Sequence, residues 1–209
     1  MKPLGQSFYN RPTLEVAREL LGCELWVHER KSVCVGRLVE VEAYVGEEDP
    51  ACHAHRGPTP RNRVMYGPPG MAYVYFTYGH HWMLNFVTEK DGFPAAVLIR
   101  GIEPLEGVSL MRRRRQVQRE HDLTSGPGKL TAALGITGGD NGESLRGPRF
   151  WVTRSRTVSD ERVMSSGRVG VNEGHERPWR FFYESSPWVS KYRLGSKAFR
   201  QRMISGRAA

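Results

Sequence analysis

The sequence predicts an α+β protein, a single mixed domain in which helices surround an antiparallel β-sheet that carries a protruding β-hairpin. Two observations predict this class. Strand-like segments follow one another in the middle of the chain, separated by Gly, Pro and Asp-Gly breakers. Helical segments with start and stop signals flank them. The 209 residues, of which 39% are hydrophobic, suffice for one good core. We therefore expect one domain over residues 1–209.

The first half of the chain begins with a helix and continues with strands. A helix is expected over residues 11–22, because Pro12 suits a first turn, apolar residues recur at helical spacing, and Gly22 is a stop signal. The strand patterns that follow cover residues 33–44, 72–78, 81–88 and 95–100. The second and third of these strands flank Gly79 and form the expected hairpin.

The second half predicts two more helices and two short strands. One helix is expected from about Pro104 through the four arginines at 112–115, of which about half should be solvated because consecutive helical positions point in different directions. The other should run from Pro127 to Leu134, capped around Ser125 and stopped by Gly135. Strand-like segments follow at residues 149–154 and 180–185.

The charge of the chain is concentrated in its second half. The formal net charge is +9, and only six of the 31 basic residues are lysine. Residues 1–104 carry 11 basic and 12 acidic side chains, whereas residues 105–209 carry 20 and 10. Guanidinium groups suit phosphate oxygens, so a polyanion such as nucleic acid should lie mainly against the C-terminal half.

Several classes of protein are disfavoured by the sequence. The apolar runs, such as residues 95–99, are too short to cross a bilayer, and the N-terminus lacks the apolar segment of a signal peptide. Three cysteines, Cys23, Cys34 and Cys52, are an odd number without paired spacing, which argues against a disulfide framework. We expect a soluble, intracellular protein without a membrane partner.

Carboxylates on the first long strand are candidates for chemistry. Period-two alternation places Leu38, Glu40, Glu42 and Tyr44 on one face. A carboxylate in an apolar environment can act as a general base for water, and two carboxylates about 6.6 Å apart could also serve a glycoside hydrolase. The same residues could equally be charges of an edge strand that face solvent or pair with arginines. The strand alone leaves these alternatives open.

Two motif-like segments are weaker than they first look. Asp49, Cys52, His53 and His55 resemble metal ligands, but adjacent Cys52 and His53 would struggle to reach one tetrahedral ion, so no metal is expected. Residues 124–131 resemble a phosphate-binding loop, yet Leu130 follows the lysine where Ser or Thr is required. What remains is a helix start rich in small residues, which offers backbone amides to a single phosphate.

The predicted hairpin carries aromatic side chains suited to nucleic-acid bases. Tyr73 and Tyr75 share a face, and Tyr78 lies beside Gly79 near the turn. An aromatic side chain at a hairpin tip can fill the gap left by an extruded nucleotide. Aromatic residues in strands are also ordinary core residues, and for Tyr73, Trp82 and Phe86 that interpretation is preferred.

Five segments together resemble a known family. They are VEVEAYVGEEDPACHA, TPRNRVMYGPPGMAYVYFTYGHHWMLN, AVLIRGIEPLEG, LTSGPGKL and SPWVS, and they occur in order between about Tyr9 and Tyr192. The chain resembles the alkyladenine (3-methyladenine) DNA glycosylases. The resemblance implies a monomeric, cofactor-free and monofunctional enzyme that flips damaged purines out of double-stranded DNA and hydrolyses the N-glycosidic bond. The alternative is a non-catalytic module that binds DNA damage on the same scaffold.

The resemblance also implies roles for individual residues. Glu42 would activate the attacking water, with Arg100 contacting the nucleotide near it. A base pocket would form around the flipped purine, Tyr78 would be the wedge, and the DNA backbone would be held near the later helix. The remaining residues implied are Tyr44, His53, Tyr75 and Asn85 for the base, and Ser125, Gly126 and Lys129 for the backbone. Two departures are His80 and His81 after the wedge, and a longer turn between Asn85 and Arg100.

Overall fold

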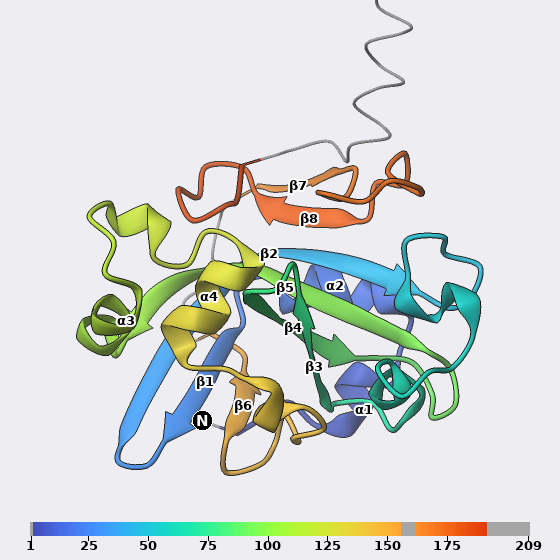
Figure 1. Ribbon diagram of the computed structural model, residues 1–209, viewed down its shortest axis with the longest axis horizontal. Coiled ribbons are helices and arrows are strands. Elements are labelled where there is room, and N and C mark those ends of the chain that lie inside the picture. The colour runs from blue at the N-terminus through green and yellow to red at the C-terminus, as the bar shows by residue number, and fades with distance from the viewer. Residues whose placement is uncertain (1, 156–161, 192–209) are drawn as a thin grey trace, which may run out of the picture.

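The chain forms an α+β fold built on one antiparallel sheet, as predicted. The computed structural model describes residues 2–155 and 162–191 (Figure 1), so the expectation of one domain over residues 1–209 stays a prediction. The main path of the eight-stranded sheet has the order β3-β4-β5-β2-β1-β6, and β8 joins β2 and β7. The strands are β1 (Glu24–Glu29), β2 (Ser32–Val45), β3 (Ala72–Thr77), β4 (His81–Val87), β5 (Ala95–Glu106), β6 (Phe150–Thr153), β7 (Val163–Ser166) and β8 (Arg180–Tyr183).

Four α-helices accompany the sheet. They are α1 (Gln6–Tyr9), α2 (Thr13–Leu20), α3 (Val108–Arg115) and α4 (Pro127–Leu134). Helix α2 packs on β2 and β5, and α4 packs on β4 and β5. Short 3₁₀ turns lie at His53–Arg56, Arg63–Tyr66, Glu120–Asp122 and Gly138–Asp140. Within residues 2–155 and 162–191, no helix is long and apolar enough to cross a membrane.

The predicted elements differ from the observed ones at several points. The bounds of α4 are as predicted, and Gly135 ends it with a left-handed φ of 67°, but the N-cap is Gly126 and no side chain caps the helix. A helix from Pro104 is wrong, because Pro104 pairs with Gly36 of β2 at an irregular point of the ladder, where a missing N–H is tolerated. The chain turns into α3 only after Gly107, whose φ of 72° favours glycine. The sequence patterns also missed α1, β1 and β7.

Strand β2 lies at the centre of the sheet and positions the candidate carboxylates. Its first half pairs with β1, its second half pairs with β8, and β5 pairs along its other edge. Figure 1 shows β7 and β8, in orange, above the second half of β2. Glu40 and Glu42 are 0% exposed, so the interpretation of them as solvent-facing charges of an edge strand is wrong.

Two apolar clusters fill the interior. The larger one joins α2 and α4 to the sheet and includes Val39, Val41 and Phe86. The smaller one includes Tyr73, and Tyr44 and Tyr75 pack against it. Trp82 packs against the larger cluster, so the core interpretation of Tyr73, Trp82 and Phe86 is confirmed.

Candidate active site

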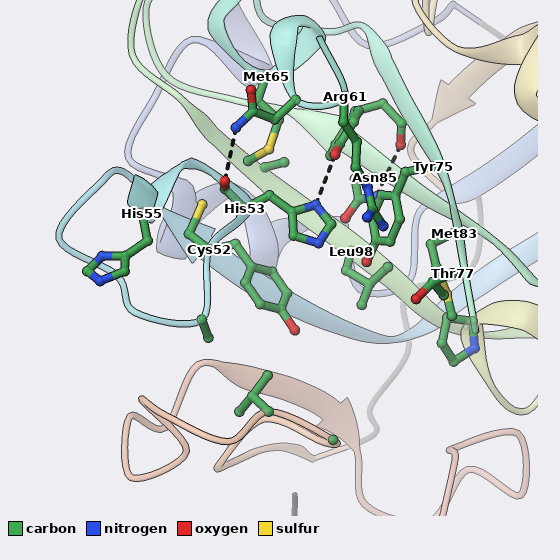
Figure 2. Close-up of a pocket in the computed structure, with 18 of the residues that line it drawn as sticks. Cys52, His53, His55, Arg61, Met65, Tyr75, Thr77, Met83, Asn85 and Leu98 are labelled. Atoms are coloured by element: carbon green, nitrogen blue, oxygen red, sulfur yellow. Dashed lines mark hydrogen bonds between the residues drawn. The ribbon is translucent and has the colours of Figure 1, made fainter. Parts of the chain in front are cut away.

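A cavity of about 1060 Å³ opens between the β3–β4 hairpin, the loop after β2 and the β7–β8 connection. Figure 2 shows His53 and Tyr75 side by side on one wall, with Leu98 of β5 nearby. Glu42 is not part of the lining, but it forms hydrogen bonds with three residues that are, Tyr44, Arg100 and Val169. The predicted site residues that line the cavity are Tyr44, His53, Tyr75, Tyr78, Asn85 and Arg100.

Glu42 is held directly behind the cavity lining by three donors. Its Oε1 atom accepts a hydrogen bond from the backbone N–H of Val169 at 2.6 Å. Its Oε2 atom accepts from the Tyr44 hydroxyl at 2.9 Å and from Nη1 of Arg100 at 3.3 Å. A carboxylate has about four lone-pair positions, so one is not taken by these donors. The three donors fix the orientation of a carboxylate that is fully buried.

Arg100 connects Glu42 to the second carboxylate of β2. Its Nε donates to Glu40 Oε1 at 3.0 Å, and its Nη2 donates to the Ser190 hydroxyl at 3.3 Å. Burial opposes the charge of Arg100, but Glu42 and Glu40 outweigh it and raise the pKa of the guanidinium. Burial would also raise the pKa of Glu40, but Arg100 and Arg180 lower it overall. Glu40 is therefore a charged partner of arginines.

The hydrogen bonds of Glu40 occupy both of its carboxylate oxygens. Arg180 Nε donates to its Oε1 at 2.7 Å, and the Ser190 backbone N–H donates to its Oε2 at 2.6 Å. Its Oε1 also accepts from Arg100 and from the Ser190 hydroxyl, so four donors occupy this carboxylate. A glycoside hydrolase that uses Glu40 and Glu42 on one substrate therefore has no support from this geometry.

The aromatic wall of the cavity is uncharged. The rings of His53 and Tyr75 meet edge to face at 4.4 Å, and Nδ1 of His53 lies 2.9 Å from the Tyr73 hydroxyl oxygen. His53 is partly exposed to the open cavity. Desolvation by the protein around its ring, and then the charge of Arg61, nevertheless lower the pKa of His53 to about 4. Burial raises the pKa of Tyr75 to about 12. At neutral pH both side chains are therefore neutral.

Tyr44 and Asn85 complete the cavity near its floor. Burial, and then the charge of Glu42, raise the pKa of Tyr44. Its hydroxyl therefore stays protonated and donates a hydrogen bond to Glu42. Asn85 is buried in β4, between Tyr73 of β3 and Leu98 of β5. Its Nδ2 donates to the Tyr73 carbonyl oxygen at 3.1 Å. The other amide N–H and the carbonyl oxygen remain for a ligand.

Tyr78 occupies the tip of the β3–β4 hairpin and is 73% exposed. Tyr78 and Gly79 have φ values of 53° and 73°, which is the left-handed pattern of a tight hairpin turn. The base of the tip rests on α4, because the His81 ring occupies the space where Gly128 would carry a Cβ atom. The tyrosine therefore projects from an otherwise supported hairpin.

Ser125, Gly126 and Lys129 lie at the start of α4 and do not line the cavity. Within this segment, Pro127 reaches the lining. Nζ of Lys129 forms an ion pair with Asp122 at 2.6 Å, and about a third of the lysine side chain is exposed. The residues predicted to contact the DNA backbone therefore lie outside the cavity lining.

The residues that resembled metal ligands have separate partners. Asp49 pairs with Arg168, and Nδ1 of His55 lies 2.6 Å from the Glu47 carbonyl oxygen. Cys52 is buried, and burial raises its pKa to about 11. In the part of the chain that the structure describes, no group of three or more His, Cys, Asp or Glu side chains is placed to share a metal ion.

The sequence patterns missed two parts of the site. Arg61 lies at the cavity mouth, with its guanidinium carbon 5.1 Å from the centre of the Tyr75 ring. Residues 169–173 form the wall opposite the hairpin, and the Val169 N–H bonds Glu42. A backbone donor has no side-chain signal, and Val169 is 127 positions from its acceptor. For Arg61, no local pattern distinguishes it from the neighbouring Arg63.

Comparison with known proteins identifies the family. The family model described as methylpurine-DNA glycosylase (MPG) matches residues 7–187. Three relatives are each named "Putative 3-methyladenine DNA glycosylase". The relative from Chlorobaculum parvum is 48% identical and covers 99% of this chain and 100% of its own. The relative from Chlorobaculum tepidum is 46% identical (93% and 94%), and that from Methanocella arvoryzae is 48% identical (91% and 97%). The chain therefore belongs to the methylpurine-DNA glycosylase family, DNA repair enzymes that hydrolyse N-glycosidic bonds.

Proposed function

We propose that this chain removes alkylated or deaminated purines from duplex DNA with a water molecule activated by Glu42. The proposed bases are 3-methyladenine, 7-methylguanine, hypoxanthine and ethenoadenine. The observation that carries the proposal is the Glu42 carboxylate, fully buried behind the cavity and fixed by three lining residues, Val169, Tyr44 and Arg100. Such a group fits proton abstraction from a single positioned water.

The reaction needs one base and stabilisation of the sugar cation. As the bond between sugar and purine breaks, the purine leaves with the bonding electrons. The oxygen of the water then bonds to the sugar carbon and its proton passes to Glu42. The charged carboxylate also stabilises the developing oxocarbenium ion. Arg100 would contact the target nucleotide beside this water. An alkylated purine already carries positive charge and departs with little acid assistance.

The neutral aromatic wall suits a flipped base. Tyr44, His53 and Tyr75 would enclose the purine, and the His53 backbone amide would donate to an acceptor on its edge. Normal adenine presents a donor amine there and would leave the site's donor unpaired. Asn85, at depth in the cavity, would reject guanine through its exocyclic amine. Stacking on aromatic rings contributes about 1 to 3 kcal/mol per base.

Tyr78 would be the wedge that fills the gap left by the flipped nucleotide. A left-handed φ costs a non-glycine residue about 1 to 3 kcal/mol, yet the tip has tyrosine where glycine would be free of strain. The ring is 73% exposed, so its burial within the described part of the chain does not offset this strain. Insertion between base pairs would supply that burial.

The start of α4 would hold the DNA backbone, and the enzyme would act as a monomer. Ser125 and Gly126 lie at the N-terminal end of an eight-residue helix, where backbone N–H groups favour an anion. Lys129 would exchange Asp122 for a phosphate. Residues 105–209 carry the excess of basic side chains, so the polyanion would meet the positive half of the chain.

The first test is base excision by wild type and Glu42→Gln. Duplexes containing one of the four lesions are incubated with each protein and then treated with alkali to cleave abasic sites. We expect alkali-dependent cleavage by wild type and a loss of at least about 100-fold in Glu42→Gln, with duplex binding retained. Glu48→Gln, an exposed carboxylate a few residues further along, is the control and should keep wild-type activity.

Three results would contradict the proposal. Strand cleavage before alkali would show β-elimination and refute a monofunctional enzyme. Equal activity of wild type and Glu42→Gln would remove the role of Glu42. Binding without excision on every lesion by folded wild type would favour a non-catalytic module that binds DNA damage.

A further inference from the structure

Arg168 is the largest fully buried side chain in the described residues, and the proposed reaction does not use it. It lies in the β7–β8 connection, one residue before the Val169 amide that bonds Glu42. We propose that Arg168 is a positioning residue that fixes the Glu42 carboxylate and both walls of the base pocket. This inference rests on the proposed function, because it assigns a residue to the same reaction.

Arg168 first ties the two walls of the cavity together. Its Nη1 and Nη2 atoms lie 2.5 and 2.7 Å from the two carboxylate oxygens of Asp49. Asp49 also accepts the backbone N–H groups of Val45 and Ala51, both at 3.2 Å, and so fixes the start of the loop that carries His53. A bidentate pair of this kind sets distance and angle together.

Arg168 also holds Tyr44, which donates to Glu42. The guanidinium carbon lies 4.7 Å from the centre of the Tyr44 ring and 5.1 Å from that of Trp179. Its Nη1 donates to the Ala43 carbonyl oxygen at 3.0 Å. The cation therefore packs on the ring and bonds the backbone next to it, which restricts both the ring plane and the hydroxyl.

The shape of the β7–β8 connection depends on the same guanidinium. Nη2 of Arg168 donates to the Gly174 carbonyl oxygen at 3.2 Å, so the side chain bonds the far end of the segment 168–174 that it begins. A Cβ atom on Gly174 would come within 2.7 Å of that Nη2, and its φ of 65° also favours glycine. The Val169 amide is thereby held against Glu42 from both ends of the segment.

These contacts require the planar fork of arginine. One side chain reaches Ala43, Asp49 and Gly174 while it packs on two aromatic rings, and a lysine ammonium cannot make this set of contacts. Burying an ion pair is costly and contributes little to stability in general. Its consequence here is geometric, because Tyr44 donates to Glu42, while Asp49 and Gly174 belong to the two segments that would enclose the purine.

The test separates the rate of excision from the amount of folded enzyme. Arg168→Lys keeps a cation for Asp49, and Gly174→Ala displaces the guanidinium while keeping its charge. Single-turnover excision is measured with excess enzyme on an ethenoadenine duplex. Misplacement of the carboxylate lowers the rate constant, whereas loss of folded protein lowers the amount of enzyme that can react. Affinity is measured on a duplex with a tetrahydrofuran abasic-site analogue, which has no base to enter the pocket.

Arg177→Met is the matched control. Arg177 is in the same connection, and its guanidinium carbon lies 4.7 Å from the centre of the same Trp179 ring, but its Nη2 donates to the Glu48 carbonyl oxygen at 3.4 Å. We expect both test variants to lose about 10- to 100-fold in rate constant at unchanged affinity for the abasic analogue, since small misplacements of catalytic groups have costs of this size. Arg177→Met should stay within about twofold of wild type.

Two results would overturn the assignment. A wild-type rate constant in Arg168→Lys would show that Arg168 has only a structural role, whatever the loss of folded protein. A loss in Arg177→Met as large as in Arg168→Lys would attribute the effect to the connection in general. Failure of the proposed function looks different, because wild type itself would then release no base.

Discussion

The floor of the cavity and the tip of the hairpin solve opposite physical problems. At and beneath the floor, Arg100, Glu40 and Glu42 are buried, and each has two or more charged or hydrogen-bonding partners. At the tip, Tyr78 is mostly exposed on a left-handed turn. Charged groups at the floor cannot be solvated by water, so other protein groups must stabilise them. The aromatic ring at the tip is in contact with water, which a second molecule would displace.

The difference separates stability from recognition. Removing one partner from a buried charge network leaves an uncompensated charge, which destabilises the folded state. Removing an exposed ring costs the folded state little and affects the complex instead. Substitutions at the floor should therefore lower both stability and activity, whereas substitutions at the tip should lower activity alone.

Arg100→Met should have the largest effect on stability. It leaves Glu40 with one arginine and Glu42 with only neutral donors, so we expect a decrease of about 3 to 5 kcal/mol in the free energy of unfolding. Urea denaturation followed by tryptophan fluorescence measures it. Arg112→Met is the control, because the Arg112–Glu120 pair is exposed on both sides and should contribute about 1 kcal/mol or less. Equal decreases in the free energy of unfolding in both variants would show that the buried charges of the floor contribute no more to stability than an exposed ion pair.

Tyr78→Ala should affect catalysis without affecting folding. We expect the free energy of unfolding to stay within about 0.5 kcal/mol of wild type. The loss of stacking in the duplex should lower kcat/KM by about 10- to 100-fold, equivalent to about 1 to 3 kcal/mol. Phe76→Ala is the control on the same hairpin, because its partly exposed ring packs on Trp82 with ring centres 4.8 Å apart. A larger loss of activity in Phe76→Ala than in Tyr78→Ala would contradict the assignment of Tyr78 as the wedge.

Local patterns predicted the elements that carry the site. The long strand with Glu40, Glu42 and Tyr44, the hairpin around Gly79 and the bounds of α4 follow from periodicity, turn residues and helix signals near each residue. Pro104 misled the same reasoning, since a proline can start a helix or lie at an irregular point of a sheet. Only the pairing with Gly36 decides between the two.

The partners of the site residues could not be predicted in the same way. Glu42 meets Val169, Glu40 meets Ser190 and Asp49 meets Arg168 across more than 100 positions of chain. No periodicity connects residues so far apart, because the fold brings them together through β8 pairing with β2. The roles assigned to the predicted site residues by family resemblance remain proposals for the same experiments to test.

The smallest effect concerns His53, which lies between the floor and the mouth of the cavity. Its pKa is about 4 in the folded protein, against about 6.5 for an ordinary histidine. Between these two values the unfolded chain binds a proton that the folded chain does not, so stability is lost as the pH falls through this window. His53→Gln should therefore show a smaller decrease in Tm between pH 7 and pH 5 than wild type. Between pH 7 and pH 8, where His53 is neutral in both states, the two proteins should change in parallel. An equal decrease in Tm below pH 7 in both proteins would mean that the pocket does not disfavour a charged imidazole. The aromatic wall would then resemble the solvent-exposed tip in its effect on charge.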